Sequence, residues 1–476
     1  MTAAVAAVDL GATSGRVMLG YVGHDELRLV PVARFPNNPV RVADGLHWNI
    51  LELYRSVTAG LASAVRDEPG LESIGIDSWA VDYALLDGER MLGTPFHYRD
   101  ERTARGVELT HEKVPFDELY RRSGLQFLPF NTLYQLAAEQ EGGWLDRADT
   151  MLLIPDLIAF WLTGSRRAEA TNASTTGLLD PRTGGWDDAL VEQLGIPRRL
   201  LPEPVRPGHE IGPLLPAVAA ELGAPAGLTV TAIGSHDTAS AVAAVPATEP
   251  GFAYISSGTW SLVGVELEHP VITEASRAAN FTNEGGVDGR VRFLQNVSGL
   301  WLLSESVRQW ERESGGPIAL PELLAAATAV TRHVPVFDAG DPVFIAPGDM
   351  PARIATWFAD RGLAAPGSRA EVTRSILESL ADAYARSIRQ AAELSGQPVS
   401  VVHVVGGGSQ NALLCQLTAD RTGLPVLAGP VEATAIGNVL VQARARGLVA
   451  GDSSLEALRA LVARTFAPTR YSPAAR

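Results

Sequence analysis

The chain has 476 residues, of which 46% are hydrophobic and 20% are charged. At about 100 to 200 residues per domain this length predicts two or three domains, and the composition excludes both a disordered chain and a collagen-like one. The formal net charge of −15 is spread along the chain without a basic patch, which argues against binding to nucleic acid or to an anionic membrane.

Targeting and redox signals point to a reducing compartment. Cys415 is the single cysteine, so an intrachain disulfide and a cysteine-rich metal site are both excluded. The apolar segment 1–8 lacks the cationic leader of a secretory signal. The apolar segment 151–162 contains Pro155 and Asp156 and is shorter than the roughly 20 residues that cross a membrane. We expect a cytoplasmic protein.

The N-terminal part has the pattern of a mixed α/β sheet. Apolar and alternating residues predict strands over 5–9, 16–21 and 26–32, with a turn at 11–15. Apolar residues recur at helical spacing from Ile50 to Val65 after a candidate N-cap, Asn49, and a strand follows at 73–77. An antiparallel meander joined to a helix crossover is the expected topology.

The segment from about Pro95 to Pro213 is rich in proline, glycine and charged residues. Its helical patterns have no strand pattern between them, so we interpret it as a cap added to the first sheet. A strand resumes at 229–235. The small apolar residues of 237–245 then predict a helix that packs closely on the sheet.

The second half repeats the opening arrangement. Strands at 252–256 and 260–266 flank a Gly-Thr turn at 257–259, which indicates either a duplicated domain or an ordinary hairpin. A long amphipathic helix is predicted over 372–388. A strand at 401–405 then leads through three glycines to another helix, which extends through Leu417.

The first candidate site follows the first strand. Asp9 ends this strand, and glycines, two hydroxyls and the Arg16 guanidinium follow within seven residues. Glycine permits tight turns, amides and hydroxyls donate to phosphoryl oxygens, and a carboxylate binds Mg²⁺ directly or through water. A plain hairpin turn is the alternative, and a Walker A loop is excluded because no Gly-Lys-Ser/Thr follows.

The second candidate site is Ser235-His236-Asp237-Thr238, at a junction of strand and helix. Such a junction directs side chains at a ligand, and Asp237 has the chemistry to accept a proton from a hydroxyl. A structural role is the alternative: Asp237 as the N-cap of the helix and His236 as a packed histidine.

Five further features give weaker signals. The turn 257–259 and the glycines 406–408 offer bare backbone to a nucleotide, although each is also typical of ordinary turns. The segments 77–82 and 97–100 combine aromatic rings with carboxylates and a guanidinium, which suits a polyhydroxylated ligand, with a solvated loop as the alternative for 97–100. Asn296 is either a helix cap or a polar ligand contact.

Taken in order, these segments resemble the FGGY family of carbohydrate kinases. The resemblance rests on the strings GIDSWAVDYALLD, QFLPFNTLYQL, EATNASTTGLLD, SHDTASAV, YISSGTWSLVG, NFTNEGG and HVVGGGSQN, and it extends from about Val5 to about Gly447. It implies two actin-like (ribonuclease H-like) α/β domains with ATP and sugar bound in the cleft between them. The implied boundaries are an N-terminal sugar-binding domain at 1–245, which includes the cap, and a C-terminal nucleotide-binding domain at 246–476.

Within the family, the strings look most like the members that phosphorylate L-rhamnulose at its 1-hydroxyl with ATP and Mg²⁺ in L-rhamnose catabolism. The resemblance implies that Asp237 is the proton acceptor and that Asp9 lies near the metal. It places the sugar against Ala80, His236, Thr238 and Asn296. It places ATP against Ala12, Thr13, Ser14, Gly15, Arg16, Thr259, Ser304, Gly406, Gly407 and Gly408. A monomer or homodimer is expected.

Two positions depart from the family pattern. Ala80 stands where a sugar-contacting glycine is expected, so its methyl group is expected to crowd the ketose or to change the preferred substrate. Ser304 stands where a glutamine that contacts ATP is expected. The alternatives are a kinase for another ketose, such as L-fuculose or D-xylulose, and a non-catalytic sugar-sensing or chaperone protein on the same fold.

Overall fold

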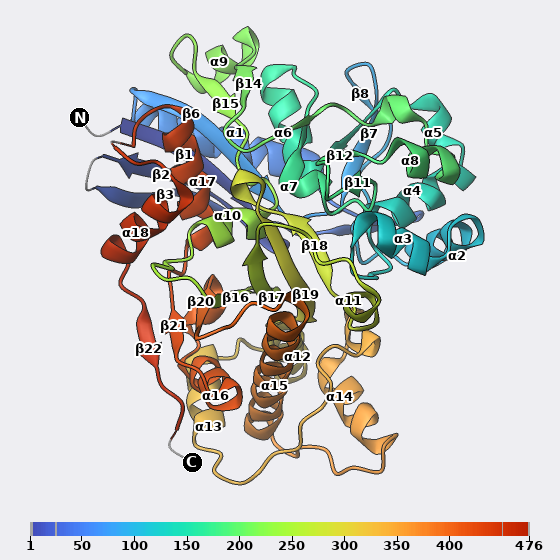
Figure 1. The fold of residues 1–476 in the computed structure, drawn as a ribbon, viewed down its shortest axis with the longest axis vertical. Helices are drawn as coiled ribbons and strands as arrows, with labels where there is room; N and C mark the ends of the chain where they lie inside the picture. The colour runs from blue at the N-terminus through green and yellow to red at the C-terminus, as the bar shows by residue number, and fades with distance from the viewer. Residues whose placement is uncertain (1–2, 24–25, 450, 475–476) are drawn as a thin grey trace. The chain divides into compact units, whose positions relative to one another are not determined.

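The computed structural model describes residues 3–23, 26–449 and 451–474, so the outermost residues of the expected domains, 1–2 and 475–476, lie outside it. The chain forms two compact units (Figure 1). The first contains Met1–Thr248, Glu266–Phe293 and Ala433–Phe466, and the second contains Glu249–Val265, Leu294–Glu432 and Ala467–Arg476. Each unit is therefore built from segments that are distant in sequence.

The first unit contains a six-stranded mixed sheet with the order β14-β15-β6-β1-β2-β3. The expected meander is confirmed, because β1 pairs antiparallel with β2 and β2 with β3. β6 then lies parallel to β1, and β15 lies parallel to β6. The bounds are β1 Ala3–Leu10, β2 Ser14–Val22, β3 Leu27–Pro36, β6 Leu71–Ser78, β14 Glu210–Pro213 and β15 Thr229–Thr231.

A second sheet repeats this connectivity. Its order is β18-β19-β17-β16-β20-β21-β22, in which β16 pairs antiparallel with β17 and parallel with β20, and β20 is parallel to β21. The shared arrangement supports the interpretation of the second half as a structural repeat. The bounds are β16 Phe252–Ser257, β17 Trp260–Leu267, β18 Thr282–Gly285, β19 Val291–Ser298, β20 Val401–Val405, β21 Val426–Ala428 and β22 Thr469–Tyr471.

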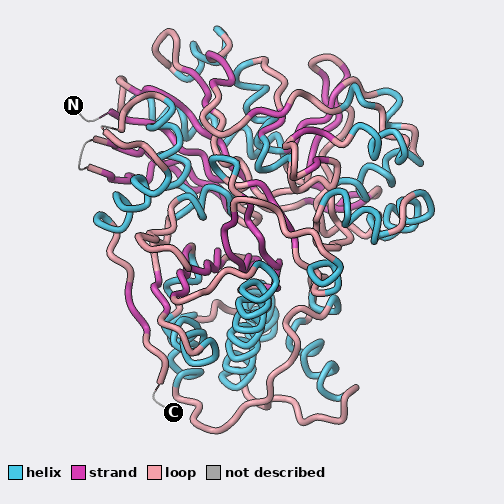
Figure 2. Tube along the Cα trace, viewed as in Figure 1, coloured by secondary structure: helices cyan, strands magenta, loops and turns pink. Residues whose placement is uncertain are grey.

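Helices lie beside the strands in both units (Figure 2). In the first unit, the predicted helix of small residues is confirmed as α10, and it packs so closely on α17 that a Cβ atom at Gly437 would lie 1.8 Å from the Ser240 carbonyl oxygen. The helices of this unit outside the cap are α1 Ile50–Asp67, α9 Pro216–Leu222, α10 Asp237–Ala243, α11 Glu274–Ala278, α17 Ala433–Ala445 and α18 Leu455–Thr465, with the 3₁₀ turn η2 at Val287–Gly289.

The second unit contains the longest helix, α15, from Arg369 to Ser395. A capping box in which Ser368 and Glu371 bond each other's backbone N–H groups begins this helix, which confirms and extends the predicted one. The other elements are α12 Trp301–Ser314, α13 Leu320–Thr328, η3 Pro342–Phe344, α14 Met350–Ala359, η4 Gly407–Gln410 and α16 Ala412–Thr422.

The cap region corrects one expectation, because strands do lie between its helices. β9 pairs with β7, and two further pairs join β10 to β13 and β11 to β12. Apart from β7, which lies before Pro95, these strands have two to four residues, too few for an alternating pattern to be recognised. The strands are β7 Tyr83–Asp87, β8 Arg90–Met91, β9 Thr150–Leu153, β10 Ala168–Glu169, β11 Leu179–Asp180, β12 Gly185–Trp186 and β13 Pro204–Val205.

The cap has its own hydrophobic core, which includes Tyr83, Leu153 and Trp186. Its helices are α2 Thr103–Lys113, α3 Phe116–Ser123, α4 Thr132–Glu141, α5 Trp144–Arg147, α6 Ile154–Thr163, α7 Ala170–Ala173, α8 Asp188–Leu194 and η1 Arg198–Leu200. A small hairpin, β4 Val40–Val42 and β5 Gly45–His47, precedes α1. Among the described residues, no helix is long and apolar enough to cross a membrane.

Candidate active site

The carboxyl ends of parallel strands in the first unit bring the candidate residues to one edge. Asp9 on β1 lies opposite Asp77 on β6. The Ser78 N–H then donates to the Ser235 carbonyl at 2.9 Å, which fixes the 234–236 loop beside β6. Polar side chains from three segments therefore meet where parallel strands end, the usual position of a ligand site in an open α/β sheet.

The turn between β1 and β2 is held tightly. The Gly11 N–H donates to the Ser14 carbonyl at 2.9 Å, and the buried Asn37 side chain donates to the Gly11 carbonyl at 2.9 Å. Gly15 is required by packing, because a Cβ atom there would lie 2.2 Å from the Phe35 ring. Thr13 is exposed and its neighbours Ala12 and Ser14 are half-buried, so the turn presents backbone and hydroxyl groups to solvent.

Asp9 and Arg16 form an ion pair at the base of this turn. The Arg16 Nε atom lies 3.1 Å from Asp9 Oδ2, and the Asp9 side chain is buried while about a third of the Arg16 side chain is exposed. The guanidinium therefore neutralises the buried carboxylate and keeps an accessible edge. This geometry suits an arginine that binds phosphate oxygens.

Asp77 adds a second buried carboxyl group that the sequence reading placed only among sugar-binding candidates. Burial raises the pKa of Asp77 well above its usual value. The neighbouring Asp9 carboxylate adds to this effect, and Asp237 acts in the same direction. The Asn438 amide donates to Asp77 Oδ2 at 2.6 Å. Asp77 Oδ1 is buried and makes no hydrogen bond.

The three carboxyl groups near this edge do not form a ready-made metal cage. Among the described residues, no group of three or more histidine, cysteine, aspartate or glutamate side chains is arranged to hold an ion. Mg²⁺ usually binds through one or two carboxylates together with substrate phosphates, and Asp9 with the unbonded Asp77 Oδ1 fits that donor set.

The structure tests the structural alternative for the 235–238 segment, in which Asp237 is the helix N-cap and His236 is a packed histidine; His236 is buried, as that alternative expects. His236 occupies the N-cap position of α10 and Asp237 is the first helical residue, so the N-cap role for Asp237 is wrong. Asp237 is half-exposed, and its Oδ1 atom accepts the Thr238 hydroxyl hydrogen at 3.0 Å. Its carboxylate is therefore accessible to a substrate hydroxyl.

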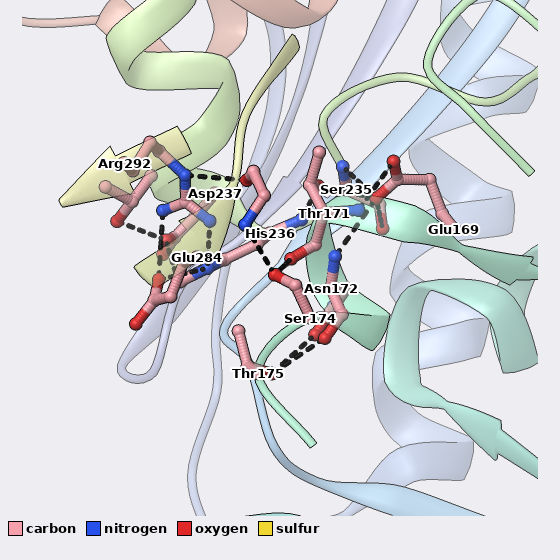
Figure 3. A network of polar contacts seen from close by, with 12 residues as sticks. Glu169, Thr171, Asn172, Ser174, Thr175, Ser235, His236, Asp237, Glu284 and Arg292 are labelled. Atoms are coloured by element: carbon pink, nitrogen blue, oxygen red, sulfur yellow. Dashed lines mark hydrogen bonds and ion pairs between the residues drawn. The ribbon is translucent and has the colours of Figure 1, made fainter. Parts of the chain in front are cut away.

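A buried network holds the loop that carries Asp237 (Figure 3). Glu169 Oε2 accepts hydrogen bonds from the Ser235 N–H at 3.0 Å and the Ser235 hydroxyl at 2.8 Å. Glu169 also accepts from the Thr171 N–H and hydroxyl, and the His236 N–H donates to the Thr171 hydroxyl at 3.3 Å. Burial raises the pKa of Glu169, which these donors oppose.

His236 is buried among three charged groups (Figure 3). Its Nδ1 atom lies 3.0 Å from an Arg292 guanidinium nitrogen and 3.3 Å from Glu284 Oε2, while its Nε2 atom lies 3.5 Å from Asp237 Oδ1. Glu284 and Arg292 belong to β18 and β19. Glu284 lies in the NFTNEGG string, but the sequence motifs assign it no role. Arg292 lies in none of the motifs.

Ala80 lies in a strained turn beside a buried carboxylate. The next residue, Val81, has φ of 69°, in the left-handed region, and the Asp82 N–H donates to the Ala80 carbonyl at 2.9 Å. Asp82 accepts hydrogen bonds from the indole N–H groups of Trp48 and Trp79 and from the Gln135 amide. Burial raises the pKa of Asp82 to about 6.

The segment 97–100 is not a solvated loop, which corrects that alternative. His97, Tyr98 and Asp100 are buried. The His97 ring stacks on Trp48 with centroids 4.1 Å apart, and burial followed by the Arg99 charge lowers its pKa to about 3. These aromatic rings therefore pack around the Ala80 turn instead of lying open to solvent.

The remaining predicted residues belong to the second unit. Asn296 lies within β19, so the helix-cap alternative is wrong, and Leu300 takes the N-cap position of α12. The Trp301 N–H donates to the Thr259 carbonyl at 3.1 Å, which ties the start of α12 to the 257–259 turn. Ser304 is exposed on the first turn of α12.

Two of the three glycines, Gly406 and Gly408, lie against that same turn. Gly406 has φ of 82°, and a Cβ atom there would lie 3.0 Å from the Ser257 carbonyl oxygen. A Cβ atom at Gly408 would lie 2.0 Å from Ser257 Oγ, whereas one at Gly407 would meet nothing within 4 Å. Close approach of two backbones therefore requires Gly406 and Gly408, and Gly407 faces open space.

Comparison with known proteins identifies the family. The N-terminal domain model of the FGGY family of carbohydrate kinases matches residues 4–244, and the C-terminal domain model matches residues 253–446. The chain belongs to this family. It is a carbohydrate kinase, which makes it an enzyme of an ATP-dependent class, and it has the two-domain α/β fold of the family.

Three curated relatives are rhamnulokinases. One from Pectobacterium carotovorum is 42% identical over 99% of this chain and 93% of its own length. One from Bacteroides thetaiotaomicron is 40% identical over 98% of this chain and 95% of its own, and one from Klebsiella pneumoniae is 44% identical over 92% and 88%.

Solved structures agree with the fold. A ligand-bound xylulose kinase from Lactobacillus acidophilus covers 99% of this chain and 94% of its own, with a TM-score of 0.77 at 15% identity. A Plasmodium falciparum glycerol kinase with ADP gives a TM-score of 0.76 at 15% identity, with the same coverage. At this identity the likeness establishes the fold.

Proposed function

We propose that this chain transfers the γ-phosphoryl group of ATP to the 1-hydroxyl of L-rhamnulose, giving L-rhamnulose 1-phosphate and ADP in L-rhamnose catabolism. The observation that carries the proposal is the 40–44% identity to rhamnulokinases over nearly the whole chain. The accessible Asp237 carboxylate at the carboxyl edge of the first sheet supports it, because the sugar hydroxyl must lose its proton as the new bond forms.

In this mechanism, Asp237 accepts the proton from the sugar 1-hydroxyl, and His236, Thr238, Ala80 and Asn296 orient the sugar. Arg16 and the amides of the 12–16 turn bind phosphate oxygens. Thr259, Ser304 and the glycines 406–408 bind the nucleotide. Phosphoryl transfer has a loose transition state, so alignment and charge neutralisation supply most of the acceleration.

Asp9, with Asp77 beside it, is the residue proposed to hold Mg²⁺ together with the nucleotide phosphates. When bound, Mg²⁺ neutralises charge on the β- and γ-phosphates. Arg16 shares this task and also holds Asp9 in place, because its Nε atom lies 3.1 Å from the carboxylate. The Asn438 amide orients Asp77 by donating a hydrogen bond to its Oδ2 atom.

The same proposal assigns the sugar to the N-terminal domain, 1–245, and the nucleotide to the C-terminal domain, 246–476. We also propose a cytoplasmic location, because the substrates are ATP and a catabolic sugar. The proposed partners are small molecules, with a monomer or homodimer as the active form.

The deciding experiment is ADP release by the purified protein with Mg-ATP and one of five acceptors: L-rhamnulose, L-fuculose, L-ribulose, D-xylulose or glycerol. A sugar-free reaction is the blank. Turnover that is highest with L-rhamnulose is the expected result, and product analysis should locate the phosphate on the 1-hydroxyl. A higher kcat/KM for another ketose would reassign the substrate, and absence of sugar-dependent ADP release would overturn the proposal.

A further inference from the structure

The charged groups around His236 come from three elements. Arg292 on β19 and Glu284 on β18 face its Nδ1 atom, and Asp237 at the start of α10 faces its Nε2 atom. Glu169 is one hydroxyl group further away, because Thr171 donates its hydroxyl hydrogen to Glu169 and accepts the His236 backbone N–H. His236 is thus the single side chain that joins Asp237 to the Glu284–Arg292 pair in these contacts.

Arg292 is fixed and permanently charged. Its side chain is fully buried, its Nε–H donates to the Gly285 carbonyl at 2.9 Å, and a terminal nitrogen lies 3.1 Å from Glu284 Oε2. A guanidinium has no acceptor atom and does not deprotonate in proteins. The nitrogen that lies 3.0 Å from His236 Nδ1 can therefore act only as a donor.

This donor favours one protonation state of the imidazole ring over the other, whereas Glu284 Oε2, 3.3 Å from the same Nδ1 atom, favours the opposite one. A hydrogen bond from Arg292 requires a lone pair on Nδ1, because an N–H there would point at the guanidinium N–H. A neutral ring with a lone pair on Nδ1 carries its proton on Nε2. Nε2 is the atom 3.5 Å from Asp237 Oδ1, so the proton is directed at the carboxylate of the proposed base.

We propose that Arg292 and Glu284 are positioning residues that hold His236 as the neutral Nε2–H tautomer, so that it orients Asp237 without adding a positive charge beside it. An imidazolium at this position would favour the ionised form of Asp237 and weaken it as a proton acceptor. The negative charge of Glu284 balances the positive charge of Arg292. The pair therefore orients the His236 ring without adding a net charge beside it. The kinetic part of the inference rests on the proposed function.

Removal of Arg292 should place a proton on Nδ1 of the His236 ring. In Arg292→Met, Glu284 alone faces Nδ1 and draws a proton to it, which gives either the Nδ1–H tautomer or an imidazolium. Adding Glu284→Gln to this variant removes the carboxylate that attracts the proton and should restore the neutral ring. If Arg292→Met does not fold, Arg292→Gln serves instead, because a neutral amide can accept a hydrogen bond from an Nδ1–H group and so no longer requires a lone pair there.

The test is a long-range ¹H–¹⁵N spectrum of protein labelled in histidine, recorded without substrate. The chain has 9 histidines, so His236→Asn identifies the signal. The unsubstituted protein should show a protonated Nε2 and an unprotonated Nδ1 at pH 7. Arg292→Met should show a protonated Nδ1, and its kcat should fall by about 10- to 100-fold with little change in KM for ATP.

A matched control is another buried Arg–Glu pair of the first unit, Arg459 and Glu266, whose charged atoms lie 2.7 and 2.8 Å apart. Arg459→Met should lower the melting temperature and leave the His236 spectrum unchanged. A protonated Nδ1 in the unsubstituted protein, or an unchanged spectrum in Arg292→Met, would overturn the proposal. These spectra are recorded without a sugar, so they decide the tautomer even if the sugar panel rejects the proposed reaction.

Discussion

Asn438 donates a 2.6 Å hydrogen bond to Asp77 across 361 positions of sequence. The Gln442 side chain supports this contact by donating to Asn438 Oδ1 at 2.6 Å and to the Ala6 carbonyl at 3.0 Å. Helix α17 therefore completes the first unit, although its sequence falls within the match to the C-terminal domain model. The carboxyl edge that carries Asp9 and Asp77 therefore receives a hydrogen bond from a segment near the end of the chain.

Asp237→Asn keeps the shape of the side chain and removes its ability to accept a proton. We expect kcat to fall by about 10²- to 10⁴-fold, the range for loss of a general base. The KM for the sugar and the melting temperature should change little, because Asp237 is half-exposed. Steady-state ADP release measures the effect, and a kcat near that of the unsubstituted enzyme would exclude Asp237 as the base.

Asp9→Asn removes the charge that pairs with Arg16 and that is proposed to hold Mg²⁺. The Mg²⁺ concentration for half-maximal activity should rise, since one anionic donor of the site is lost. A thermal shift titration with Mg-ADP gives a second readout that does not depend on turnover. Identical Mg²⁺ dependence in both measurements would place the metal elsewhere.

Ala80→Gly restores the residue expected at the sugar-contacting turn. The KM for L-rhamnulose should fall by about 5- to 150-fold, because one methyl group in a binding pocket is worth roughly 1–3 kcal/mol. The KM for ATP should stay constant. Kinetics with L-rhamnulose, L-fuculose and D-xylulose test the effect, and unchanged sugar constants for all three would show that the Ala80 methyl group does not face the substrate.

Asp82 should make stability depend on pH. Its pKa rises from 3.8 to about 6 on folding, so between these values the folded protein holds a proton that the unfolded chain has released. The stability contributed by the neutral carboxyl group is complete below pH about 4 and decreases as the pH rises through about 6, by about 3 kcal/mol in total.

Urea unfolding of the unsubstituted protein and of Asp82→Asn at several pH values isolates this contribution. The difference in unfolding free energy should change between pH about 4 and about 6 and should level off above it. His97 titrates in an overlapping range with the opposite sign, because its pKa is lowered to about 3. His97 is present in both proteins, so its contribution cancels in the difference unless the two groups interact. A difference that is independent of pH would contradict the raised pKa of Asp82.

The glycines 406–408 provide a matched pair of variants. Gly407→Ala places a methyl group in open space, so the protein should fold normally and the KM for ATP should rise if the nucleotide lies there. Gly408→Ala forces a methyl group against Ser257, so the melting temperature should fall. Equal KM values for ATP in Gly407→Ala and the unsubstituted protein would remove Gly407 from the nucleotide site.

The sequence by itself determined the elements with strong local patterns. The strands on either side of the 11–13 turn, α1, α15 and the strand before Gly406 follow from apolar periodicity, glycine turns and capping residues, which depend on near neighbours in the chain. The Asp9 to Arg16 and Ser235 to Thr238 segments were also recognisable, because their side-chain chemistry is concentrated within a few residues.

Only the tertiary structure decided the contacts between distant segments. The short strands of the cap are stabilised by pairing with other strands, and they are too short to show a periodic pattern in the sequence. The buried Asp77 carboxyl group accepts a hydrogen bond from the distant Asn438. Arg292 on β19 lies within hydrogen-bond distance of His236 at the start of α10. Burial and long-range hydrogen bonds set the charge and orientation of these groups, and neither is encoded in local sequence pattern.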